Sequence, residues 1–127
     1  MAGSLHQTLL MVSDLDASVA FYRDLVGLSI GEAGEGNVEF ETGESTLVLE
    51  SDFDQEVLDA FGLKQPGEER GMGVIVAIEV ADVEAVYNRA RAAEVAIRMD
   101  PREVPWGRRM MLLSDPDGYA VEVSRPL

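Results

Sequence analysis

Two short stretches with one pattern decide the fold of this chain: V-S-D-L-D-A at residues 12–17 and V-A-D-V-E-A at residues 80–85. One offset, which carries residue 12 onto residue 80, superposes them. In each stretch an aspartate, Asp14 or Asp82, follows an apolar run and precedes apolar positions at helical spacing, which is typical of a helix N-cap. The same start signal in both halves indicates an internal duplication.

The elements around these two stretches repeat in the same order. In the first half the patterns predict a strand, a helix that begins after Asp14 and ends at Gly27, and strands at 28–33, 37–42 and 45–50. In the second half they predict the same order of elements: a strand at 74–80, a helix that begins after Asp82, and three strands at 95–104, 108–114 and 119–124. Each half is therefore a βαβββ module, and the fold class is α+β.

The chain of 127 residues is long enough for one domain with a real core. We expect module one at 4–62, with a short helix before Gly62, a linker at 63–72 that is rich in Gly, Pro and charge, and module two at 73–127. Modules with open sheet edges must pair with each other or with a second chain.

Composition limits the partners. The formal charge of −14 disfavours nucleic acid and anionic membranes, and it suits a cationic or neutral small molecule better. The absence of cysteine excludes disulfides and thiolate chemistry. No apolar run approaches the roughly 20 residues that cross a bilayer, and the start lacks a signal-peptide pattern. We therefore expect a cytoplasmic protein.

Two motifs carry a family resemblance. V-S-D-L-D-A-S-V-A-F-Y-R-D-L-V-G-L at 12–28 and D-P-D-G-Y-A-V-E-V at 115–123 resemble the signatures of the vicinal oxygen chelate superfamily, which includes glyoxalase I, extradiol dioxygenases and bleomycin-resistance proteins. The resemblance implies two modules that form a half-open barrel around a cavity, in a homodimer with modules paired or swapped between chains. It does not select a reaction, since the family hosts many.

The resemblance also implies where a divalent metal (Mg, Mn, Ni or Zn) would bind. Gln7 falls on the first ligand position and Glu122 on the last; Glu50 or Val48 falls on the second, depending on how the strand is counted. The third position falls on Val74 or Ile75, which carry no donor, so the implied set of Gln7, Glu50 and Glu122 is incomplete.

Two nearby residues bear on that set. Glu79, four residues after Ile75, would share its face of a strand and is a candidate for a further donor or a ligand contact. His6, the only histidine, is next to Gln7 and is expected to point to the opposite face.

Other residues are candidates for ligand binding without a metal. Trp106 and Arg108 in P-W-G-R-R could stack on a planar ligand or hold an acid, and Met110 and Phe40 could line a cavity. Each also has a structural interpretation, since aromatic residues and methionines commonly fill a core.

Two functions remain. The first, which the missing third ligand favours, is a resistance-type protein that sequesters a small molecule in a dimer-interface cavity. The second is a metal-dependent lyase, isomerase or dioxygenase in which Glu122 or Glu50 moves a proton.

Overall fold

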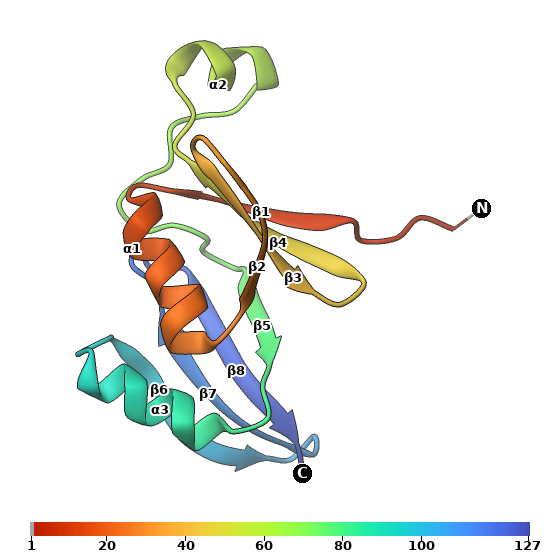
Figure 1. Ribbon diagram of the computed structural model, residues 1–127, viewed down its shortest axis with the longest axis vertical. Coiled ribbons are helices and arrows are strands. Elements are labelled where there is room, and N and C mark those ends of the chain that lie inside the picture. Colours follow the sequence, from red (N-terminus) through yellow and green to blue (C-terminus); the bar gives the residue numbers. More distant parts are fainter. Residues whose placement is uncertain (1) are drawn as a thin grey trace. The chain divides into compact units, whose positions relative to one another are not determined.

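The computed structural model describes residues 2–127 and divides into two compact units, residues 1–66 and 67–127 (Figure 1). The division falls inside the segment 63–72 that the sequence predicts as a linker. Within the described part of the chain, no helix is long and apolar enough to span a membrane.

Unit 1 contains four strands and three helical segments. In chain order these are β1 (Gln7–Val12), α1 (Leu15–Val19), the π-helical segment η1 (Ala20–Val26), β2 (Ser29–Gly34), β3 (Asn37–Thr42), β4 (Ser45–Ser51) and α2 (Gln55–Phe61). Unit 2 contains four strands and one helix: β5 (Ile75–Glu79), α3 (Val83–Ala92), β6 (Ile97–Val104), β7 (Arg108–Ser114) and β8 (Ala120–Pro126).

The two sheets have the same topology. The strand order is β1-β4-β3-β2 in unit 1 and β5-β8-β7-β6 in unit 2. In each sheet the first strand pairs in parallel with the last strand, and the other pairs are antiparallel. The prediction of an α+β chain built from two βαβββ modules is confirmed.

The two N-caps that suggested the duplication are equivalent in detail. The side chain of Asp14 accepts a hydrogen bond from the amide of Ala17 at 3.1 Å, and that of Asp82 accepts one from Ala85 at 3.0 Å. Their backbone angles also match, with φ of −138° and −133°. The repeat in sequence is thus a repeat in local structure.

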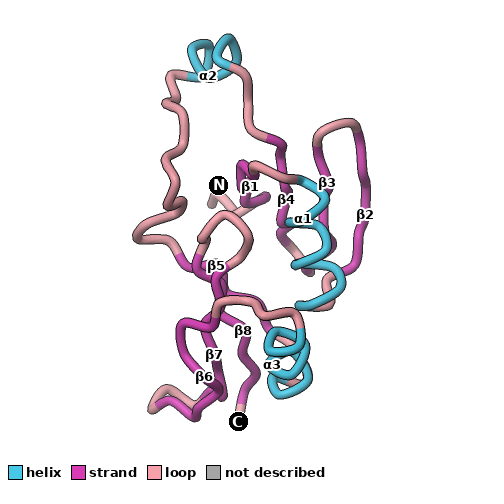
Figure 2. Tube along the Cα trace, turned by 90° about the vertical axis from the view of Figure 1, so that its left-hand side faces the viewer, coloured by secondary structure: helices cyan, strands magenta, loops and turns pink. Residues whose placement is uncertain are grey.

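Each sheet has one face covered by its own helix, as the ribbon and tube views show (Figure 2). In unit 1 the ring of Tyr22 in η1 lies 6.2 Å from that of Phe40 in β3, and both side chains are fully buried. In unit 2 Arg109 of β7 forms an ion pair with Glu84 of α3. Because side chains alternate along a strand, the residues between these positions lie on the opposite, helix-free face.

Helix η1 departs from the simple helix that the periodicity predicts. Amide groups of Gly27 and Leu28 both donate to the carbonyl of Tyr22, at 3.1 and 2.9 Å, as the wider π turn ends. Gly27 then leaves the helix with φ of 99°, a left-handed conformation that favours glycine.

The buried position of Phe40 gives a prediction about stability. We expect Phe40→Ala to lower the free energy of unfolding by about 3–5 kcal/mol, since it leaves a cavity between β3 and η1. Leu9→Ala, at a side chain that is 46% exposed, should cost about 1 kcal/mol or less. Urea denaturation of both variants provides the comparison, and equal losses would contradict this assignment of Phe40 to the core.

Candidate functional site

The helix-free face of unit 2 is defined by the register of three strands. Ile75, Ala77 and Glu79 of β5 lie beside Ala120, Glu122 and Ser124 of β8, respectively. On the other side of β8, the same three residues lie beside Ser114, Leu112 and Met110 of β7. Paired residues point to the same face of a sheet, so this face carries a carboxylate, hydroxyls and apolar side chains.

A hydrogen-bonded chain crosses one end of this face and includes Glu122. The hydroxyl of Ser124 donates to Glu122 Oε2 at 3.1 Å and accepts from Nε of Arg108 at 3.0 Å. Arg108 Nη2 donates to Glu79 Oε1 at 2.6 Å. Two carboxylates are thus connected through one hydroxyl and one guanidinium, and Ser124 itself is 2% exposed.

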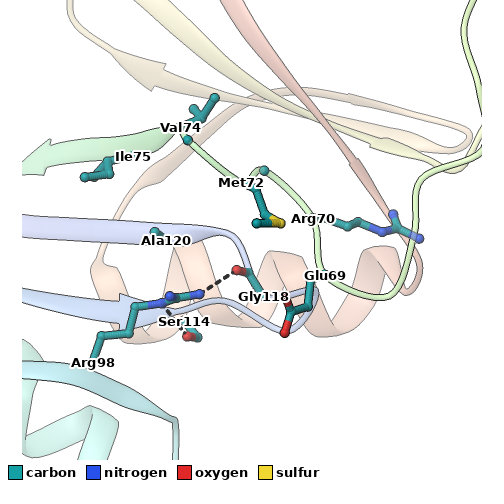
Figure 3. A pocket seen from close by; sticks show the side chains of 11 residues that line it. Glu69, Arg70, Met72, Val74, Ile75, Arg98, Ser114, Gly118 and Ala120 are labelled. Atoms are coloured by element: carbon teal, nitrogen blue, oxygen red, sulfur yellow. Dashed lines mark hydrogen bonds between the residues drawn. The ribbon is translucent and has the colours of Figure 1, made fainter.

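A pocket of about 650 Å³ opens at the other end of the same face. Ile75, Ala120 and Ser114, one row of paired residues, form part of its wall, and residues 69–74 form another part. Figure 3 shows Met72, Val74 and Ile75 on one side of the view and Arg98, Ser114 and Gly118 on the other. Glu122 follows Ala120 by two residues on β8, about 7 Å along the strand.

Residues 69–73, which we call the strap, are fixed to the turn before β8. Arg70 in the strap lies 3.8 Å from a carboxylate oxygen of Asp117, and both side chains are at least nine-tenths buried. Gly71 has φ of 72°, and a Cβ there would lie 2.4 Å from Cδ1 of Tyr119. Two separate constraints therefore favour glycine at position 71: its left-handed backbone conformation and the adjacent ring of Tyr119.

The turn itself is held by Asp115. Its Oδ1 accepts hydrogen bonds from the amides of Asp117 and Tyr119, each at 2.9 Å, and Gly118 adopts φ of 88°. This explains locally why D-P-D-G-Y is a compact turn. Burial raises the pKa of Tyr119 above its ordinary value of 10.0, against an opposing effect of the Arg70 charge.

Arg98 of β6 contributes a cation to the pocket. Its Nε donates to the hydroxyl of Ser114 and its Nη2 to the carbonyl of Gly118, each at 2.8 Å (Figure 3). Both acceptors are uncharged. A guanidinium has five N–H donors, so three remain after these two bonds.

The residues predicted in unit 1 share the helix-free face of their sheet but are far apart on it. Gln7 lies opposite Thr46, whose hydroxyl is 3.4 Å from Gln7 Oε1, whereas Glu50 lies opposite Met11. Glu50 is therefore displaced from Gln7 by four residues along the ladder, or about 13 Å. Val48 lies between these two rows, opposite Leu9.

A match to a family model over most of the chain is consistent with this architecture. Residues 4–123 match the model of the Glyoxalase/Bleomycin resistance protein/Dioxygenase superfamily. The chain belongs to this superfamily. The resemblance noted from the two sequence motifs is thereby confirmed.

Three relatives of this superfamily member illustrate the range of similarity. CFP32 of Mycobacterium tuberculosis, which is named as a candidate glyoxylase, is 30% identical over 98% of the chain, and the chain spans only 44% of its length. The lactoylglutathione lyase of Haemophilus influenzae is 28% identical, with 91% of this chain and 87% of that protein covered. The crystal structure of a lactoylglutathione lyase from Agrobacterium tumefaciens has a TM-score of 0.70 and 28% identity, over 98% of this chain and 95% of that one.

The donor set of this superfamily member does not fit a resident divalent metal. A metal bound at about 2.0–2.2 Å from its ligands cannot bridge Gln7 and Glu50 across about 13 Å of sheet. In unit 2, the side chain of Glu122 is bonded to Ser124, and Val74 and Ile75 provide no donor atom at the third position. No group of three or more His, Asp or Glu residues among residues 2–127 could hold a metal ion.

The other predicted residues have different surroundings. Arg108 and Glu79 are connected to Glu122 by the series of hydrogen bonds that passes through the hydroxyl of Ser124. Met110 lies on the helix-free face beside Ser124 and is 6% exposed. Phe40 is enclosed in the core of unit 1 and lines no open surface, and Trp106 is 68% exposed in the turn between β6 and β7.

Sequence reasoning missed the pocket and its arginine. The strap has the Gly and charge content of a linker, and Arg98 stands in a strand with no motif around it. The available signal was the pair of glycines, Gly71 and Gly73, directly before a predicted strand. Its significance depends on Tyr119, which is distant in sequence.

The strap gives a test with a built-in control. Gly71→Ala and Gly73→Ala both place alanine at a positive φ, of 72° and 83°, but only Gly71 faces the ring of Tyr119, whereas Gly73 has nothing within 4 Å. We expect both to destabilise the protein, and Gly71→Ala to cost about 1–3 kcal/mol more because of overpacking. Urea denaturation measures the difference, and equal costs would show that the ring is not packed against Gly71.

Tyr119 predicts a dependence of stability on alkaline pH. Since its folded-state pKa lies above the ordinary value of 10.0, the folded state holds the phenol proton more tightly, and this stabilisation is lost as pH rises through the folded-state pKa. The free energy of unfolding should fall more steeply above pH 10 in the wild type than in Tyr119→Phe. Parallel pH profiles for the two proteins would contradict this assignment.

Proposed function

We propose that the chain is a ligand-binding member of its superfamily that holds a small molecule on the helix-free face of unit 2 without a resident metal. The observation that carries this proposal is the use of Glu122, the carboxylate at the last ligand position, in a chain of hydrogen bonds with Ser124 and Arg108. The guanidinium of Arg108 forms its ion pair with Glu79 and is linked to Glu122 through the hydroxyl of Ser124, so Glu122 is held by neighbouring side chains of the sheet.

The face has the chemical character of a small-molecule site. The pocket volume of about 650 Å³ lies within the range of roughly 300–1,000 Å³ for ligand sites. Its wall combines apolar side chains with a hydroxyl, a guanidinium and a backbone carbonyl, which can fix the orientation of a ligand. Sequestration of the ligand requires no further catalytic group, and this is the function that we propose.

The alternative function is a metal-dependent lyase of the glyoxalase type. The identity of 28% to the lactoylglutathione lyase of Haemophilus influenzae favours it. In that case Gln7 and Glu122, which carry oxygen donors, would contribute to a metal site whose other ligands come from elsewhere. The two functions differ in one measurable property, the affinity of the protein for divalent cations.

Calorimetric titration of chelator-treated protein with manganese, nickel, zinc and magnesium separates the two. We expect no stoichiometric binding tighter than about millimolar, because the donors are too far apart on the sheet of unit 1 and too few in unit 2. The same titration of a Gln7→Ala, Glu122→Ala double variant is the control. Tight binding that the double variant loses would overturn the proposal and support the lyase.

A further inference from the structure

Arg98 differs from three other arginines of unit 2 in its partners. Arg70, Arg108 and Arg109 are each paired with a carboxylate, of Asp117, Glu79 and Glu84. Among the described residues, Arg98 is paired with none; its partners are the hydroxyl of Ser114 and the carbonyl of Gly118. Within residues 2–127, Arg91 and Arg125 also bond only uncharged oxygens, of the Tyr87 hydroxyl and the Pro126 carbonyl, but neither lines the pocket, whereas Arg98 does.

The two hydrogen bonds to uncharged acceptors also fix the position of the charged guanidinium of Arg98. They orient the planar guanidinium at the wall of the pocket, and they leave donors free on the same group. A preorganised guanidinium loses less side-chain entropy when it binds an oxyanion than a mobile one does, and it can donate two parallel hydrogen bonds. The geometry is therefore that of a receptor for a carboxylate or a sulfonate.

The rest of the wall indicates what such an anion would be attached to. Met72, Val74 and Ile75 have exposed fractions of 83%, 53% and 57%, and they line the pocket together with Ala120. Exposed apolar surface next to a fixed cation suits a ligand with an apolar body and an anionic end. The strap that carries Met72 is held in place by Arg70 and Gly71, so this wall is formed before a ligand binds.

We propose that the pocket selects an organic anion, with its carboxylate or sulfonate on Arg98 and its apolar body against Met72, Val74 and Ile75. This inference rests on the proposed function, and it adds the class of ligand. It also reverses the expectation from net charge, because a local guanidinium determines binding at contact distance while the remaining charges are screened beyond about 10 Å at 0.1 M salt. Glu69, which also lines the pocket, is exposed and opposes the anion only in part.

Fluorescence titration with two matched probes tests the proposal. The probes are 1-anilinonaphthalene-8-sulfonate and N-phenyl-1-naphthylamine, which share an apolar body and differ in the sulfonate. We expect the wild type to bind the sulfonate more tightly, Arg98→Gln to weaken its binding about tenfold, and the uncharged probe to be unaffected. Glu69→Gln should tighten binding of the sulfonate, a change of opposite sign.

Two further variants control for nonspecific effects. Arg102→Gln removes the same charge from β6 outside the pocket lining and should leave the affinity for both probes unchanged. Arg98→Lys keeps the charge and loses the planar fork, so it should retain part of the preference. If Arg98→Gln does not fold, as circular dichroism would show, the response to Glu69→Gln and the preference of the wild type decide the matter.

The outcomes separate this inference from the proposed function. Equal binding of the two probes, with no effect of Arg98→Gln or Glu69→Gln, would overturn anion selection and leave small-molecule binding intact. No binding of either probe would overturn both. A preference for the sulfonate that is equally reduced by Arg102→Gln would indicate a general charge effect and would also overturn the assignment to Arg98.

Discussion

The register between strands β5, β8 and β7 is the constraint on which the candidate site depends. It places Ser124 between Glu79 and Met110, Glu122 between Ala77 and Leu112, and Ala120 between Ile75 and Ser114. A shift of one residue would turn these side chains towards α3 and bring Val121 and Val123, which are fully buried, to the helix-free face. Burial of these valines therefore fixes the polar groups of the site.

The same kind of constraint in unit 1 separates residues that the superfamily pattern would bring together. Parallel pairing of β1 with β4 aligns Gln7 with Thr46 and Glu50 with Met11. The carboxylate of Glu50 is thus too far along the sheet to share an ion with Gln7, although both lie on the same face. Hydrophobic packing of the opposite face, through Leu10, Leu47 and Leu49, holds that register.

Charge is distributed so that the carboxylates and guanidiniums of unit 2 have distinct roles. Arg109 and Arg70 connect elements, α3 to β7 and the strap to its turn. Arg108 donates hydrogen bonds to both Glu79 and Ser124, and it thereby joins Glu79 to the hydrogen-bonded pair of Ser124 and Glu122. Arg98 is oriented by neutral groups and retains its charge for a ligand, in our proposal. The overall charge of −14 conceals this difference, because it sums over positions that act locally.

Local patterns in the amino-acid sequence specify the elements, their order and the duplication. Helix caps, tight glycine turns and apolar spacing are local signals, so Asp14, Asp82 and the strands at 37–42 and 108–114 could be predicted without knowledge of their neighbours. The family resemblance of the sequence motifs also placed Glu122 on the last ligand position. Which side chains meet is known only from the fold: Arg108 with Ser124 and Ser124 with Glu122, Tyr119 with Gly71, and Arg98 with Gly118. These contacts depend on strand register and on the packing of the strap, which join residues distant in the chain, and no local pattern specifies them.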